Sequence, residues 1–348
     1  MFYSQLLMLK DAFPEEFLDR ADQYLGSLSS EARKNISISR MAVHLNCSYE
    51  KSADFLAACV KTGFLKKYFV LCCPECGHII KKIASVGDIK NIEYCVRCDE
   101  EVSKDDFDRT QDIEVRFEIV QNAPFVEGQH RFDLSRSRES ADAVRPDSLQ
   151  YAWDHGVVEL EDFYAPAADC VDELLERANT IDSRHYDTNT ERGTFLEQLI
   201  VDIFNQCTCF SATREFRTEL NQIDGFVVVK KYLKGGFFDA IGSYFYVECK
   251  NENSRPENGY ISKLSDIMGR NGCSFGIFVS KKSTPDTFQQ LCHELFLWRK
   301  QVIICVTTQE IIELLSNNDN FIEFLQRKYI EVCTNATSNL RDLHVLGG

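Results

Sequence analysis

The stretch FFDAIGSYFYVECK, residues 237–250, decides the fold expected for the C-terminal half of the chain. Two apolar runs, 237–241 and 244–250, flank a Gly-Ser pair. Short apolar runs rich in aromatic and β-branched residues, separated by two turn-forming residues, are typical of two antiparallel strands. We therefore expect a β-hairpin here.

This hairpin is expected to gather charged side chains on one face. Because side chains alternate along a strand, Glu248 and Lys250 should share a face while Cys249 points into the core. A two-residue turn would set Asp239 on the same face as Glu248 and diagonal to it, within reach of a shared ion. Upstream, Glu197 lies on the amphipathic helix expected to open this half of the chain.

These residue types suit the hydrolysis of a phosphodiester bond. The reaction calls for a divalent ion that neutralises developing negative charge and acidifies a water molecule. Carboxylate oxygens from two neighbouring strands are suitable ligands for Mg²⁺ or Mn²⁺. A lysine two residues along the second strand would orient the attacking water or stabilise the transition state as a point charge.

The surrounding pattern predicts an α/β domain. Apolar strands alternate with amphipathic helices, which implies a mixed central sheet flanked by helices on both faces. The expected helices are 194–205, 260–268 and 284–298, and the expected strands besides the hairpin are 225–232, 275–280 and 302–306.

An Asp followed by Glu-x-Lys on a helix–strands–helix frame resembles the PD-(D/E)XK nuclease superfamily, especially its Mrr-like restriction endonuclease branch. The resemblance covers roughly residues 190–315. It implies that Asp239 and Glu248 are metal ligands, with the carbonyl of Cys249 as a third, and that Lys250 is the catalytic lysine. It also implies that Glu197 is the helix glutamate that supports the metal site.

Some features depart from this pattern or leave the assignment open. Phe238 stands where the family's name has proline, and the interval from Asp239 to the glutamate is short. Asp224 is a rival for the aspartate role, although it needs a longer excursion before the glutamate and no turn fixes its register. Lys263 or Ser265 would be the further polar residue that the family often has on the following helix.

A four-cysteine array lies in the N-terminal half. Cys73 and Cys76 form one C-x2-C pair, Cys95 and Cys98 form a second, and 18 residues separate the pairs. Two such pairs complete the tetrahedral four-thiolate shell that suits a structural Zn²⁺. The segment resembles a zinc ribbon.

The residues before this array predict a second recognition element. Helices are expected at 37–45 and 49–62, followed by Gly63 as a helix-ending residue and a strand at 64–70. Two helices joined by a tight turn and followed by a strand resemble a winged helix-turn-helix unit. Contact with DNA and docking of a protein are both open for such a unit.

Composition and charge define the class of protein and its segments. A hydrophobic content of 44% and a net charge of -15 suit a soluble globular chain, and no apolar run approaches the roughly 18 residues of a membrane span. The scattered cysteines and the lack of a secretory signal favour a reducing, cytoplasmic compartment. We expect a multidomain chain: a winged-helix domain (1–70), a zinc ribbon with its following strand (71–120), an acidic connecting region (121–189), a nuclease-like domain (190–330) and a tail (331–348).

The acidic excess is concentrated in the middle of the chain. Residues 91–190 carry 25 Asp and Glu against 10 Lys and Arg, so the rest of the chain is neutral. This segment is expected to be either a solvated connection or an acidic surface that repels or mimics DNA phosphate.

The function expected from these features is that of a Mg²⁺-dependent or Mn²⁺-dependent endonuclease that cuts DNA, in the manner of a restriction or phage-defence effector. DNA is the expected partner, an activating protein or a homo-oligomer remains open, and no membrane is involved. The alternative is a non-enzymatic adaptor or regulator that binds nucleic acid or protein and uses an inactive nuclease-like fold as a scaffold.

Overall fold

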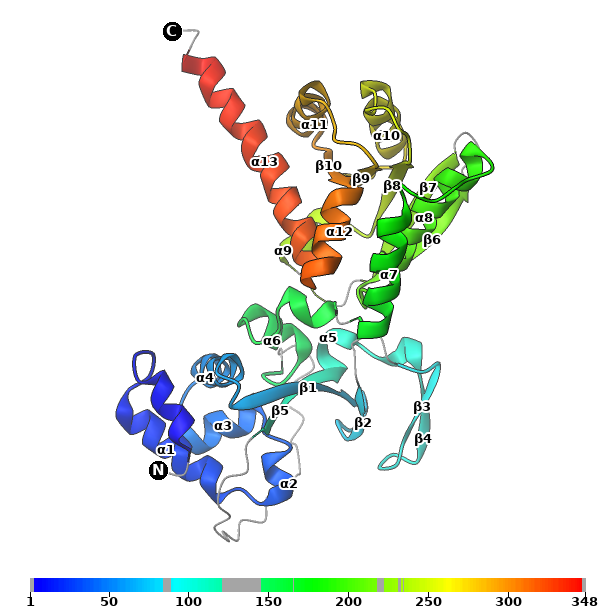
Figure 1. The fold of residues 1–348 in the computed structure, drawn as a ribbon. Helices are drawn as coiled ribbons and strands as arrows, with labels where there is room; N and C mark the ends of the chain where they lie inside the picture. Colours follow the sequence, from blue (N-terminus) through cyan, green and yellow to red (C-terminus); the bar gives the residue numbers. More distant parts are fainter. Residues whose placement is uncertain are drawn as a thin grey trace. The chain divides into compact units, whose positions relative to one another are not determined.

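A computed structural model describes residues 3–83, 89–120, 145–164, 166–217, 222–230, 233 and 235–345. The chain divides into two compact units, Met1–Glu159 and Leu160–Gly348 (Figure 1). This division differs from the five segments expected from the sequence, because the described parts of the expected connecting region pack into one unit or the other. Residues 121–144 of that region lie outside the described residues.

The first unit begins with short helices. They are η1 (Ser4–Leu9), α1 (Glu15–Ser27), α2 (Ser30–Arg33), α3 (Ile38–Leu45) and α4 (Tyr49–Lys61), so both helices expected for the helix-turn-helix are confirmed. Ser37 and Ser48 cap the last two through side chains that accept hydrogen bonds from backbone N–H groups. Asn46 ends α3 in the left-handed region, and Gly63 follows α4 with a φ of 73°.

A three-stranded antiparallel sheet completes the core of the first unit. Its order is β2 (Ile79–Ile83), β1 (Leu65–Cys72) and β5 (Ile113–Ile119), and α4 packs against β1. The strand expected after the cysteines is β5. It pairs with β1 over residues 65–71 of that strand. The segments 1–70 and 71–120 consequently share one sheet.

The remaining elements of the first unit are short. They are the hairpin of β3 (Ile92–Cys95) and β4 (Glu100–Ser103), then η2 (Lys104–Asp106), α5 (Arg109–Asp112) and α6 (Leu149–Asp154).

A buried cluster of charges joins α3, β5 and the residues before α6. Arg116 forms ion pairs with Glu114 on its own strand and with Asp147, the latter at 3.2 Å. The carboxylate of Asp147 also accepts hydrogen bonds from the backbone N–H of Ser39 at 2.9 Å and from its hydroxyl at 2.5 Å. Some of the acidic residues of the middle segment are thus structural, whereas the sequence suggested a solvated or repelling surface.

The second unit is built on a five-stranded mixed sheet. Its order is β10 (Val302–Thr307), β9 (Phe275–Ser280), β8 (Tyr244–Lys250), β7 (Gln222–Val229) and β6 (Phe210–Arg217). The pairs among β6, β7 and β8 are antiparallel, and the pairs among β8, β9 and β10 are parallel. The mixed sheet was expected, but β6 was missed. Residues 231–232 of the expected strand 225–232 lie outside the described residues.

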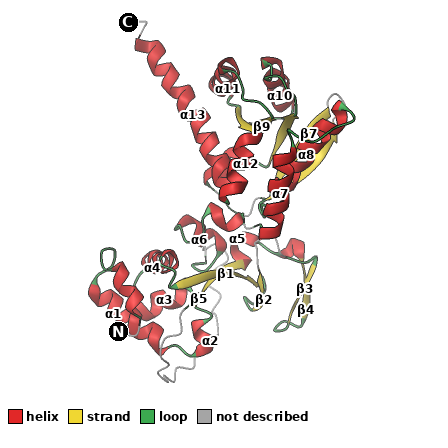
Figure 2. Ribbon diagram, in the orientation of Figure 1, coloured by secondary structure: helices red, strands yellow, loops and turns green. Residues whose placement is uncertain are grey.

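Two helices pack against several strands of this sheet. Helix α8 (Asn189–Asn205) packs against β6, β7 and β8, and α10 (Asn258–Arg270) packs against β8 and β9 (Figure 1). The others are η3 (Leu160–Phe163), α7 (Ala168–Thr180), α9 (Gly236–Ile241), α11 (Asp286–Arg299), α12 (Thr308–Asn317) and α13 (Phe321–Val345). Figure 2 shows α13 as one long helix, where the sequence suggested a tail from residue 331.

The second unit starts 30 residues earlier than the nuclease-like domain expected from the sequence. Tyr164 forms a β-bridge with Cys207, and the backbone N–H of Thr208 donates to the carbonyl of Phe163 at 2.8 Å. Helix α7 packs against α8. Residues 160–180 are therefore part of this fold.

The hairpin expected from residues 237–250 is wrong in its first half. Residues 236–241 form helix α9, in which Phe237, Phe238 and Ile241 are buried. Gly235 precedes it with a φ of 95° and Gly242 follows it with a φ of 79°, conformations that favour glycine. The antiparallel partner of β8 is β7.

No helix in the described part of the chain is long and apolar enough to cross a membrane.

Candidate functional site

The pairing of β7 with β8 places two carboxylates opposite each other. Gly225 pairs with Val247 in this antiparallel ladder, so the preceding residue, Asp224, faces Glu248. The strands approach closely here, because a Cβ atom on Gly225 would lie 3.2 Å from the Cβ of Val247. Glycine at this position therefore favours the register that sets the two acids side by side.

Lys250 joins the two carboxylates. Its Nζ lies 2.8 Å from Oε1 of Glu248 and 3.4 Å from Oδ2 of Asp224. The backbone N–H of Cys249 also donates to Oδ2 of Asp224 at 2.9 Å. Burial lowers the pKa of Lys250, but the charges of Glu248 and Asp224 outweigh that effect and raise it above its ordinary value of 10.5. The ammonium is thus fully protonated near neutral pH.

Helix α10 adds a second cation to this group. The Nζ of Lys263 lies 3.4 Å from Oε1 of Glu248. Ser265, the other residue considered for this helix, is fully buried and donates to Oε1 of Gln301 at 2.5 Å. Of the two, only Lys263 faces the carboxylates.

Helix α8 brings Glu197 to a cleft at the end of β8. A cleft of about 670 Å³ is lined by Glu197, Lys250 and Asn251, together with the first turns of α8 and residues 252–254. Glu197 lies 3.8 Å from Arg214 of β6. The side chain of Cys249 is buried beneath this site, as the alternation along the strand predicted, and burial raises the pKa of its thiol well above the ordinary value.

Asp239 takes no part in this group. It lies on α9 with an exposed side chain, and its carboxylate accepts a hydrogen bond from the backbone N–H of Gly235 at 2.8 Å. No contact among the described residues joins it to Glu248 or Lys250. Helix α9 leads into the first residue of β8, whereas the charged group lies at the last residues of that strand. The geometric argument for Asp239 therefore fails, and its rival Asp224 occupies the position beside the glutamate.

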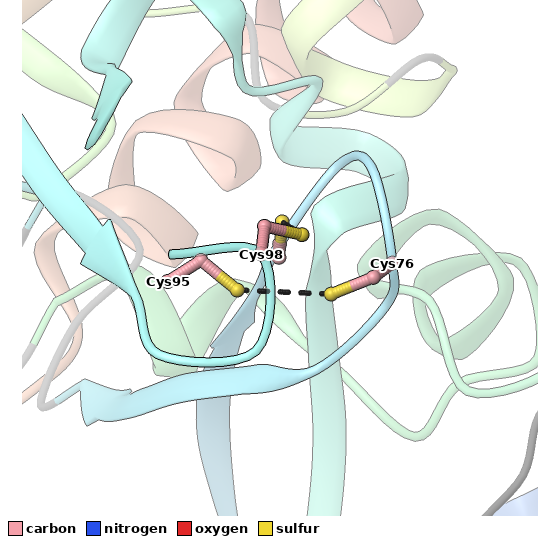
Figure 3. Close-up of side chains that lie close together, drawn as sticks. Cys76, Cys95 and Cys98 are labelled. Carbon is pink, nitrogen blue, oxygen red and sulfur yellow. Dashed lines mark hydrogen bonds between the residues drawn. The ribbon is translucent and has the colours of Figure 1, made fainter. Parts of the chain in front are cut away.

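The four cysteines of the first unit converge on one point. The Sγ atoms of Cys73, Cys76, Cys95 and Cys98 all lie within 4.8 Å of one another. The Sγ atoms of Cys73 and Cys98 are 3.9 Å apart. Those of Cys76 and Cys95, joined by a dashed line in Figure 3, are 3.7 Å apart. Tetrahedral Zn–S bonds of about 2.3 Å require S–S distances of about 3.8 Å. The donor set fits a four-thiolate Zn²⁺ site.

Both cysteine pairs sit in the same kind of turn. Gly77 and Asp99, which follow the second cysteine of each pair, have φ values of 67° and 61°. Backbone N–H groups in each turn point at the first thiol of the pair. At Cys95, burial raises the pKa, but N–H groups and neighbouring thiols outweigh it and lower the pKa to about 7. Thiolate is the form that binds metal.

An ion pair links the strands that carry the two turns. Lys81 on β2 and Glu93 on β3 are 2.6 Å apart, and the glutamate is buried. This contact links the β3–β4 hairpin to the three-stranded sheet and thereby keeps the two cysteine pairs close together.

Comparisons with known proteins add little to this geometry. No family model matches the chain, and no curated protein matches it. Among solved structures, the chain is similar to the DNA modification-dependent restriction endonuclease AspBHI, with 13% sequence identity over 84% of this chain and 74% of that chain and a TM-score of 0.28. A superposition at this TM-score carries no argument about function, so the case below rests on the side chains.

Proposed function

We propose that the second unit is a metal-dependent nuclease that hydrolyses DNA phosphodiester bonds, with Asp224 in the role expected for Asp239. The observation that carries the proposal is the placement of Lys250 within 3.4 Å of carboxylates from two adjacent strands, at the rim of a cleft. An aspartate on one strand and Glu-x-Lys on the next form the arrangement that the resemblance implied.

The donor set fits a hard divalent ion. Asp224 and Glu248 would supply one carboxylate each, the carbonyl of Cys249 would supply a third oxygen, and Glu197 would support the site from α8. Such oxygens hold Mg²⁺ or Mn²⁺ with water molecules left in place. When bound, the ion neutralises charge on the phosphate and acidifies water.

The lysines have separate roles in this proposal. Lys250, within 3.4 Å of both carboxylates, acts as a positive charge that holds the attacking water or stabilises charge on the phosphate. Lys263 contacts Glu248 and orients that carboxylate. The first unit, with its helix-turn-helix and its zinc site at Cys73, Cys76, Cys95 and Cys98, serves as the recognition half.

Plasmid cleavage separates this function from that of a non-enzymatic adaptor. Purified protein is mixed with supercoiled DNA and Mg²⁺ or Mn²⁺, with and without EDTA. A nuclease nicks or linearises the plasmid only with the metal, and Lys250→Ala loses several orders of magnitude in rate while it stays folded, because it removes no metal ligand. Folded protein that leaves the plasmid intact with either ion, with no partner added, favours the adaptor.

A further inference from the structure

Two arginines, one that lines the cleft and one on the segment before α8, have no acidic partner among the described residues. Arg192 on α8 lines the cleft together with Lys250, and Arg184 lies on the exposed segment just before that helix. No ion pair within the described residues engages either guanidinium. By contrast, nearby Arg177 pairs with Asp202 at 2.7 Å.

Aromatic rings hold these two guanidiniums in place. Arg184 lies 5.9 Å and Arg192 lies 5.7 Å from the ring centre of Tyr186, and Arg184 also lies 4.6 Å from the ring centre of Phe195. Cation–π contacts restrict the side chains, yet they leave the charge and the hydrogen-bond donors of the guanidiniums available. The result is a preorganised pair of planar cations.

The pair is tied directly to the strand that carries the hydrolytic group. Asn251, the residue after Lys250, donates from Nδ2 to the backbone carbonyl of Arg192 at 2.8 Å. Asn251 is 4% exposed and is one of the residues that line the cleft. The backbone of Arg192 is therefore fixed relative to the end of β8.

We propose that Arg184 and Arg192 bind backbone phosphates of the substrate strand beside the phosphate that is cut. The inference rests on the proposed nuclease function and names the side from which the strand enters the cleft. Guanidinium groups match phosphate oxygens in a planar, two-point geometry, and the remaining charges of the chain are acidic in excess. These two side chains therefore supply local affinity that the chain as a whole lacks.

The test measures binding separately from cleavage. The full chain, with no Mg²⁺ or Mn²⁺ added so that it does not cut, is titrated against a fluorescein-labelled DNA duplex. The dissociation constant is followed by anisotropy over a range of salt concentrations. Arg192→Gln should weaken binding about tenfold near 0.1 M salt and reduce the slope of log K against log salt by about 1. Arg184→Gln should act alike, and Arg192→Lys should restore the slope but only part of the affinity.

A matched control uses Arg270. It is exposed at the end of α10, beyond the opposite end of β8, and has no ion pair within the described residues, so Arg270→Gln should leave both quantities unchanged. Equal losses in the Arg192 and Arg270 variants, or an unchanged slope in Arg192→Gln, would overturn the proposal. So would wild-type protein that does not bind the duplex. If Arg192→Gln does not fold, the binding affinity and salt slope of Arg184→Gln, a change at an exposed position, test the proposal.

The binding result and the nuclease result can fail independently. Metal-dependent cleavage that is lost in Lys250→Ala upholds the nuclease even if the arginine variants bind normally. A chain that binds through both arginines but never cuts retains the phosphate site and loses the hydrolytic function.

Discussion

Replacing Arg116 by methionine should strongly destabilise the first unit. The arginine is 5% exposed and lies between Glu114, 0% exposed, and Asp147, 3% exposed. Methionine fills a similar volume but leaves two buried carboxylates without their cation. Removing one partner of a buried ion pair costs about 3–5 kcal/mol, because the charge left behind stays out of water. We expect a loss of that size in the free energy of unfolding of the first unit.

The assay is urea unfolding of the full chain followed by hydrogen exchange in peptides from β1 and β5. Glu114→Gln added to Arg116→Met should recover part of the loss, since it removes one of the two unpaired charges. The control is Arg299→Met, whose pair with Asp266 is 52% and 55% exposed and should be worth less than about 1 kcal/mol. If Arg116→Met costs no more than Arg299→Met, the buried cluster does not stabilise the unit.

Three further outcomes follow from the two sites. Protein never exposed to chelator should contain one Zn²⁺ per chain by elemental analysis. Cys76→Ser should unfold the cysteine turns, because metal binding and folding are coupled there. Zinc-free protein with ordered turns would contradict both expectations. Gly225→Ala should lower the free energy of unfolding by about 1–3 kcal/mol and slow cleavage, because the added methyl group contacts Val247. An unchanged midpoint of urea unfolding would show that the two strands can move apart without cost. The pKa of Lys250 is raised in the folded protein, so its ion pairs stabilise the fold fully below pH 10.5 and this stabilisation is lost as the pH rises through the folded pKa. The difference in unfolding free energy between wild type and Lys250→Met should therefore shrink above pH 10.5. A difference that grows would refute the ion-pair assignment.

Local patterns in the sequence predicted much of the fold. Alternation along β8 placed Glu248 and Lys250 on one face and Cys249 in the core, as the structure has them. The two cysteine pairs were read from spacing alone, because a C-x2-C turn constrains its own geometry. The boundaries of β9 were predicted to the residue, since a fully buried strand is a continuous apolar run.

The strand expected to carry Asp239 is helix α9 in the structure, and the reason is physical. An apolar run as short as 237–241 shows no periodicity, so its sequence cannot distinguish a strand from a short buried helix. Part of the signal for Asp224 was local, because the strand was expected to begin at Gly225 and one more residue puts Asp224 on it. The register between β7 and β8 then sets Asp224 opposite Glu248. Pairing between strands far apart in sequence decides such a question, and no local pattern records it.

The domain boundaries depended on long-range contacts as well. Acidic composition suggested that residues 121–189 form a connection, yet Asp147 is buried against Arg116 and helix α7 packs against α8. A fragment meant to isolate the second unit should therefore begin at Leu160, where that unit starts, because a start after Thr180 would remove α7.

The central claim is that Asp224, and not Asp239, completes the hydrolytic group with Glu248 and Lys250. The most direct measurement compares Asp224→Asn with Asp239→Asn, two variants of equal size and charge change in the same unit, in metal-dependent plasmid cleavage alongside Mn²⁺ binding by calorimetry. We predict that Asp224→Asn loses cleavage by several orders of magnitude and binds Mn²⁺ weakly, while Asp239→Asn matches wild type in both. Normal cleavage by folded Asp224→Asn, or loss of cleavage confined to Asp239→Asn, would contradict the account.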